Sequence, residues 1–287
     1  MASYGRTLLL FGAMTLLMMG VGWMLGALWG TDPTGTMLLF LVLAALFNLV
    51  TYFFSDKFVL WTYRAKIVGP EEAPRLHRIV RELVQGTDLP MPRVAIVPSM
   101  NPNAFATGRD PKHAVVAATE GILRLLDDEE LRGVMAHELA HVKNRDILIM
   151  SLAATVAGAI AFAARSAFWS MLFGGNRNGG GNVLVAVLLA VTAPIAAILV
   201  QLAISRNREY AADRVGAQIH GRPLALASAL RKLHAYAGRV PMQQGNPATA
   251  HMFIVNPFTG GGMAAMFATH PPMEERVRRL EAMAYAL

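Results

Sequence analysis

Two histidines and a glutamate stand at the spacing of a metal-dependent hydrolase. His137 and His141 are four residues apart, in the run His-Glu-Leu-Ala-His. On a helix, residues four apart lie on one face, so both imidazoles can reach a single metal ion. Glu138 follows the first histidine directly, where its carboxylate can hold the water that attacks a carbonyl. These residues predict two ligands and the general base of a zinc peptidase. The alternative is an amphipathic helix with two histidines near its core.

The remaining metal ligand must come from elsewhere in the chain. Catalytic zinc commonly takes three protein ligands, and cysteine is excluded because the sequence contains none. Six acidic residues follow the second histidine: Asp146, Glu209, Asp213, Glu274, Glu275 and Glu281. Glu209 and Asp213 stand four residues apart, so on a helix one can bind the metal while the other accepts a hydrogen bond from an imidazole. The alternative is a solvated helix whose arginine and glutamate side chains simply pair.

The segment from about Asp127 to Arg145 is expected to form the helix that carries the histidines. Its first residues are acidic, which favours a helix N-terminus, and Asp127 and Glu130 have the spacing of a capping box. Charged residues flank the motif on both sides, whereas a site inside a membrane-spanning helix would have apolar flanks. We therefore expect the metal at or just below a membrane surface, accessible to water.

Upstream of this helix, the pattern predicts a small sheet. Hydrophobic spacing over 71–86 is typical of a helix, and 94–97 and 114–118 are expected to be strands. Between these strands, 101–108 is expected to form an edge strand or a turn. The polar part of the chain is therefore expected to be α+β.

The composition is too apolar for an ordinary soluble domain. Hydrophobic residues make up 54% of the chain and charged residues only 16%, and the mean hydropathy is +0.40. The net charge is +7, but no basic stripe with interleaved aromatic residues is present, so we expect no nucleic-acid partner. The basic residues stand beside hydrophobic runs, which indicates contact with the anionic face of a lipid bilayer.

Four apolar stretches, 8–29, 37–54, 147–173 and 183–204, are candidates for membrane spans. A spanning helix needs about 20 residues, so four transmembrane helices in two hairpins are expected. The alternative for the last two is a buried helical hairpin within the folded domain. Most lysines and arginines flank one side of these stretches, so the positive-inside rule places both termini and the polar blocks in the cytoplasm.

The expected fold is a mainly α membrane protein with an α+β metalloprotease domain of the zincin type and a small sheet. Residues 1–54 form an N-terminal transmembrane hairpin, and 147–204 form a second hydrophobic hairpin. The polar blocks 55–146 and 205–287 must come together, because each holds part of the chemistry. The first block carries the two histidines, and the second carries the third ligand.

Four motifs in this order resemble the HtpX family, bacterial membrane zinc endopeptidases related to the CAAX prenyl proteases. They are Asn103–Gly108, His137–His141, Arg208–Asp213 and Thr269–Arg276. The metal motif alone is shared by many peptidases, whereas the four together are specific. The resemblance extends over essentially the whole chain, including the two hydrophobic hairpins.

The resemblance implies one Zn²⁺ per chain, bound by His137, His141 and Glu209, with Glu138 as the catalytic base. Asp213 is then left for the role of orienting an imidazole. The resemblance also implies an inner-membrane location and the degradation of damaged or misassembled membrane proteins at the cytoplasmic face. Protein substrates are therefore the expected partners.

Two further roles are expected near the metal. The resemblance implies that Asn103, Ala104, Phe105 and Ala106 belong to an edge strand that binds an extended substrate by backbone pairing. A donor aimed at the developing oxyanion could come from His270 or Tyr210, although His270 is equally suited to a structural turn or a helix cap. The rival functions are a CAAX-type prenyl-protein endopeptidase and a non-catalytic membrane scaffold stabilised by zinc.

Overall fold

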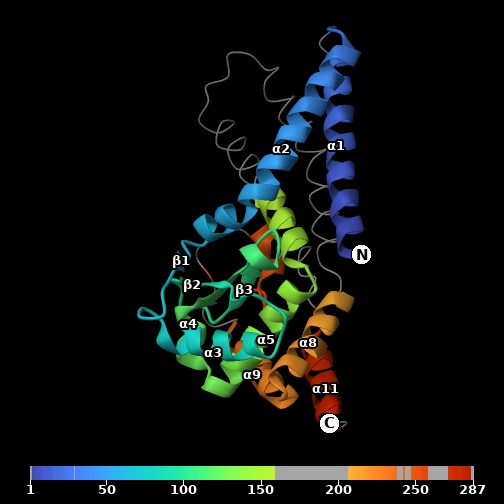
Figure 1. Cartoon of the computed structure of the whole chain (residues 1–287). Coiled ribbons are helices and arrows are strands. Elements are labelled where there is room, and N and C mark those ends of the chain that lie inside the picture. Colours follow the sequence, from blue (N-terminus) through green and yellow to red (C-terminus); the bar gives the residue numbers. More distant parts are fainter. Residues whose placement is uncertain are drawn as a thin grey trace, which may run out of the picture. The chain divides into compact units, whose positions relative to one another are not determined.

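The computed structural model describes residues 2–28, 30–158, 206–237, 242, 247–257 and 271–285 (Figure 1). These residues separate into two compact units, Met1–Ser55 and Asp56–Leu287. Most of the expected second hairpin, 147–204, lies outside the described residues, and so does His270.

The first unit contains two long apolar helices. Helix α1 spans Ala2–Leu28 and α2 spans Pro33–Thr62, continuing past the unit boundary. Both are long and apolar enough to cross a membrane. Many of their large apolar side chains are exposed, with Leu8 and Leu16 each 70% exposed, which is typical of a surface in contact with lipid rather than of the core of a soluble protein. The described part of the chain thus contains two helices that fit the first two of the four expected spans.

The turn between α1 and α2 follows from local chemistry. Asp32 precedes α2, and its carboxylate accepts hydrogen bonds from the N–H groups of Thr34 and Gly35 at 3.0 and 2.9 Å, as an N-cap does. Further along, Asn48 of α2 donates to the Thr15 hydroxyl of α1 at 3.0 Å. A polar contact of this kind holds two apolar helices together where burial of apolar surface contributes little.

The second unit is built on a four-stranded mixed sheet. The strands are β1 (Lys66–Ile67), β2 (Arg93–Val97), β3 (Ala104–Thr107) and β4 (Val115–Thr119), in the order β1-β2-β4-β3. Strands β2 and β4 are parallel, and β3 runs antiparallel to β4 at one edge, with Phe105 opposite Ala117. The expected strands at 94–97 and 114–118 are present within one residue, and 101–108 contains an edge strand.

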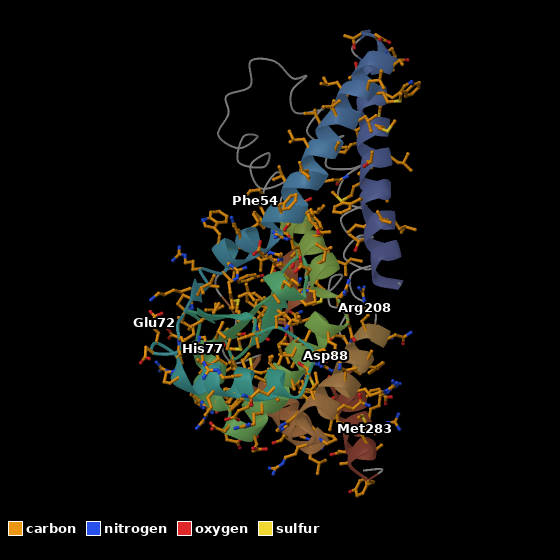
Figure 2. All side chains as sticks on the ribbon, in the orientation of Figure 1. Phe54, Glu72, His77, Asp88, Arg208 and Met283 are labelled. Carbon is orange, nitrogen blue, oxygen red and sulfur yellow. The ribbon has the colours of Figure 1, made fainter. Side chains whose placement is uncertain are left out.

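Helices surround this sheet, and α5 (Asp128–Lys143) is the central one. It packs against α3 (Pro74–Gln85), α8 (Arg206–His220), α9 (Pro223–Ala237) and strand β3 (Figure 1). The short α4 (Glu120–Leu125) follows β4, and α11 (Met273–Ala284) packs on α8 and α9. Figure 2 shows the side chains of these elements, with Arg208 near the beginning of α8 and Met283 near the end of α11. The prediction of a mainly helical chain with a small sheet is confirmed.

Both ends of α5 are fixed by their own sequence. Asp127 accepts from the N–H of Glu130, and Glu130 accepts from the N–H of Asp127, which is the expected capping box. At the other end, Arg145 has a positive φ of 59°, and the N–H of Asp146 bonds back to the carbonyl of His141 at 2.9 Å. This left-handed turn ends the helix and leads directly into the apolar helix Ile147–Gly158.

Candidate metal centre and active site

Three buried side chains point their donor atoms at one small volume between α5 and α8. The Nε2 atom of His137 lies 3.7 Å from one carboxylate oxygen of Glu209, and Nε2 of His141 lies 3.5 Å from the other. One ligand atom from each of the three residues lies within 4.8 Å of the others. The structure therefore brings together the two histidines and the glutamate that were predicted as ligands, although they are separated by about seventy residues in the sequence.

The spacing and chemistry of these donors fit a zinc ion. Zinc bonds of about 2.1 Å at tetrahedral angles place two ligand atoms roughly 3.4 Å apart, close to the observed distances from Glu209 to His137 and His141. Two imidazoles and one carboxylate form a common catalytic donor set, and they leave a fourth position for water or substrate.

A second carboxylate holds each histidine ring in place from behind. Asp213, one turn after Glu209 on α8, lies 2.9 Å from Nδ1 of His137. Asp146 lies 3.4 Å from Nδ1 of His141. When each ring is neutral, a proton on Nδ1 facing the carboxylate leaves a free lone pair on Nε2, on the side of Glu209. The sequence left open which of Glu209 and Asp213 orients an imidazole, and in the structure Asp213 has this position.

Arg276 of α11 places a positive charge next to the negative charges of Asp213 and Glu209. Its guanidinium donates two hydrogen bonds to Asp213, at 2.8 and 2.7 Å, and lies 3.7 Å from Glu209. Burial alone would raise the pKa of Asp213, but the Arg276 guanidinium holds that pKa well below its usual range. Asp213 therefore stays ionised, and Arg276 itself is fully buried.

Glu138 directly follows His137 on α5, and its side chain is 1% exposed. Burial raises the pKa of its carboxyl group to about 7, with the charge of Glu209 adding to the rise and His141 opposing it. The carboxylate also accepts a hydrogen bond from the N–H of Ala106 in β3. A carboxyl group with a pKa near neutrality can both take up and release a proton at the working pH, as a general acid–base requires.

The two helices of the site approach closely because of one glycine. A Cβ added at Gly216 of α8 would lie 2.9 Å from the backbone N and Cα of His137 on α5. Only a residue without a side chain allows this approach. The backbone of α5 at His137 is thus in direct contact with α8, the helix that carries Glu209.

A model of peptidase family M48 matches residues 70–284. The chain belongs to peptidase family M48. The "Protease HtpX homolog" of Thermococcus kodakarensis is 54% identical over 97% of this M48 chain and 95% of its own length. That of Syntrophobacter fumaroxidans is 52% identical over 99% of this chain and 100% of its own length. These relatives confirm the resemblance to the HtpX family, and the family confirms the prediction of a metalloendopeptidase.

A solved structure, the crystal structure of S. mikatae Ste24p, is also similar to this M48 chain. The match has a TM-score of 0.49 and 16% sequence identity, and it covers 98% of this chain and 66% of that one. The likeness is weak.

The other described residues that were predicted to act near the metal lie at the edge of the sheet and on α8. The strand Ala104–Thr107 is an edge of the sheet, with Asn103 directly before it, and the N–H of Ala106 bonds to Glu138. The binding of a substrate along this edge stays a prediction. The ring of Tyr210 lies under the Arg279 guanidinium, 3.7 Å from the ring centroid to Cζ. Because residues one apart on a helix face different directions, Tyr210 does not share the face on which Glu209 meets the histidines.

Two residues of the site in this M48 chain were missed by sequence reasoning. Asp146 was counted among the acidic residues, but its place beside His141 depends on the left-handed turn at Arg145. Arg276 was noted only as the last residue of a motif. The positive charge of Arg276 could have identified it, because two buried acids on one helix, Glu209 and Asp213, need a cation nearby.

We expect the zinc affinity of the M48 chain to rise with pH up to about 9. Burial lowers the pKa of His141, but its hydrogen bond with Asp146 and the charges of Glu209 and Glu138 outweigh burial and raise that pKa to about 9. A zinc ligand must be a neutral imidazole, so binding near pH 7 displaces this proton. The apparent affinity should increase close to tenfold per unit from about pH 6 to 8. Competition with a chelating dye, corrected for the dye's own protonation, measures this, and a flat profile would contradict it.

Gly216→Ala is expected to reduce zinc affinity at least about tenfold and to destabilise the M48 fold by roughly 1–3 kcal/mol. The added methyl group would overlap the backbone at His137, so α8 must move and carry Glu209 away from the histidines. Gly69→Ala is the matched control, since a Cβ there meets nothing within 4 Å. Metal titration and thermal unfolding of both variants provide the measurement, and equal zinc affinity in the two would refute the close-approach argument.

Proposed function

We propose that this chain is a membrane-anchored, zinc-dependent endopeptidase that cleaves damaged or misassembled membrane proteins at the cytoplasmic face of the inner membrane. The observation that carries the proposal is the cluster of His137, His141 and Glu209 with Glu138 buried beside it. The relatives named as HtpX protease homologues support it. The two exposed apolar helices support the membrane anchor.

The residues divide the reaction between them. When bound, zinc supplies Lewis-acid polarisation of the scissile carbonyl and of the attacking water. Glu138 takes the proton of that water and passes it to the leaving amine. His137, His141 and Glu209 would hold the metal, and Asp213 and Asp146 would keep the two imidazoles in the tautomer that presents Nε2 to it. Arg276 keeps Asp213 ionised.

The rival functions receive less support from the site. A structural zinc site is usually closed by four ligands, whereas the described cluster offers three and has a buried carboxyl group of raised pKa next to them. A prenyl-protein endopeptidase would use the same catalytic groups, so the two enzymes differ only in substrate. Comparing the cleavage of an unfolded protein with that of a prenylated peptide separates these activities.

Removing the metal is expected to abolish proteolysis by the purified, lipid-reconstituted chain. After dialysis against a chelator, casein should stay intact over a time in which the untreated protein degrades it, and one equivalent of zinc should restore cleavage. Metal content is measured in parallel by mass spectrometry. Continued cleavage by a chain shown to be metal-free would refute the proposed function.

A further inference from the structure

The outer edge of β3 is covered by a segment from a distant part of the sequence, Phe253–Val255, which we call the covering segment. The N–H of Ile254 donates to the carbonyl of Ala104 at 3.3 Å. The side chain of Asn103 donates to the carbonyl of Val255 at 2.6 Å and accepts from its N–H at 3.4 Å. The main chain of the covering segment is therefore bound to the main chain of the edge strand at Ala104 and to the side chain of Asn103.

The covering segment is also bound to the charged network behind the metal centre. Arg276 donates from Nη1 to the carbonyl of Ile254 at 3.0 Å. The other two nitrogen atoms of the same guanidinium, Nε and Nη2, donate to the carboxylate of Asp213. Both main-chain groups of Ile254 are thus satisfied, one by the edge strand and one by the arginine that supports His137 through Asp213.

Apolar contacts hold the covering segment in place. The ring of Phe253 meets Phe105 of β3 edge to face, with centroids 5.3 Å apart, and meets Tyr63 in the same way at 4.9 Å. All three side chains of the covering segment are buried. A protein substrate cannot pair with the outward C=O of Ala104 while this segment is bound to it.

We propose that the covering segment is an internal competitor of the substrate. An extended peptide that adds to a sheet edge uses the outward N–H and C=O groups of that edge, and the covering segment already uses the C=O of Ala104, two residues before Ala106, whose N–H bonds to Glu138. The inference rests on the proposed function and adds its regulation: the segment must leave β3 before a substrate strand can pair there. Since buried side chains anchor it, the open form is a minor population, and the apparent substrate affinity is reduced by that fraction.

A reversible crosslink tests this directly, because the chain contains no cysteine of its own. The double variant Phe105→Cys/Phe253→Cys places two thiols where two rings now touch. Oxidised, the chain should cleave casein at least about tenfold more slowly than the same preparation reduced with a phosphine, at equal zinc content. Mass spectrometry verifies the crosslink, and both single variants control for the loss of each ring. Equal rates for the crosslinked and reduced chain would overturn the inference.

Ile254→Pro gives an independent test if the crosslink does not form, since it removes the N–H that binds Ala104. We expect kcat/KM for casein to rise several-fold, mainly through a lower KM. Leu233→Ala, a buried residue of α9, controls for a general loosening of the core. A folded Ile254→Pro variant no faster than wild type would also overturn the inference. If no zinc-loaded form cleaves casein, wild type included, the proposed function itself falls, and the inference with it.

Discussion

Replacing Glu138 with glutamine is expected to lower the rate of peptide cleavage by about 10³-fold while zinc stays bound. General acid–base groups contribute about 10²–10⁴-fold, and an amide keeps the shape of the carboxyl group but cannot accept the proton of the attacking water. Because Glu138 is not one of the three clustered ligands, metal content should not change. The measurement is kcat for a fluorogenic peptide or casein, with zinc quantified in the same samples.

Glu129→Gln is a matched control for this change. Glu129 lies on the same helix and contacts Arg222 at 2.9 Å near the surface, so its loss should leave kcat within about twofold, because surface ion pairs contribute little. A zinc-loaded Glu138→Gln chain with wild-type kcat would remove Glu138 from the mechanism, even if the metal proved essential.

Replacing Glu209 with alanine is expected to weaken zinc binding by at least about 100-fold and to eliminate cleavage at low free zinc. Removing a partner behind a ligand costs about 10–100-fold in metal affinity, and removing the ligand itself should cost more. The loss also leaves His137 and His141 without the carboxylate that both face at 3.7 and 3.5 Å. Chelator competition on the purified variant measures the affinity.

Glu274→Ala is the control for this second change, because Glu274 is an exposed acid at the start of α11. It removes one negative charge from the same part of the chain without touching the cluster. If Glu209→Ala bound zinc as tightly as Glu274→Ala does, another residue would have to be the third ligand.

Much of the site could be predicted because its parts are local. The i, i+4 spacing of His137 and His141 places both rings on one face of a helix wherever that helix lies. The capping box at Asp127 and Glu130 marks where the helix begins, and both of its hydrogen bonds are present. The same spacing rule predicted that Glu209 and Asp213 lie on one face of a helix. It could not predict which of them faces the metal side of the histidines and which orients an imidazole.

The parts that could not be predicted depend on contacts across the fold. Asp146 reaches His141 only because Arg145 adopts a left-handed conformation, which a non-glycine residue rarely does. Arg276 meets Asp213 from a helix that begins about sixty residues later, and no periodic pattern records such a pairing. The edge strand at Ala104 was expected, but the segment that lies on it, around Ile254, was not.

The first two apolar helices could also be predicted from local sequence, whereas the arrangement of the second hydrophobic hairpin could not. Length and apolar composition were enough to predict α1 and α2, since a helix that spans a bilayer is specified by its own sequence. The second hydrophobic hairpin is represented among the described residues only by Ile147–Gly158. The choice between two further spans and a buried hairpin therefore stays a prediction.

X-ray absorption spectroscopy of the zinc-loaded chain tests the central claim most directly. We predict one zinc per chain with two imidazole nitrogens at about 2.0–2.1 Å and oxygen ligands at about 2.0–2.2 Å. In Glu209→Ala, any zinc that remains should keep both imidazoles and lose or exchange an oxygen. A spectrum with fewer than two imidazoles, or one unchanged in the variant, would contradict a centre made by His137, His141 and Glu209.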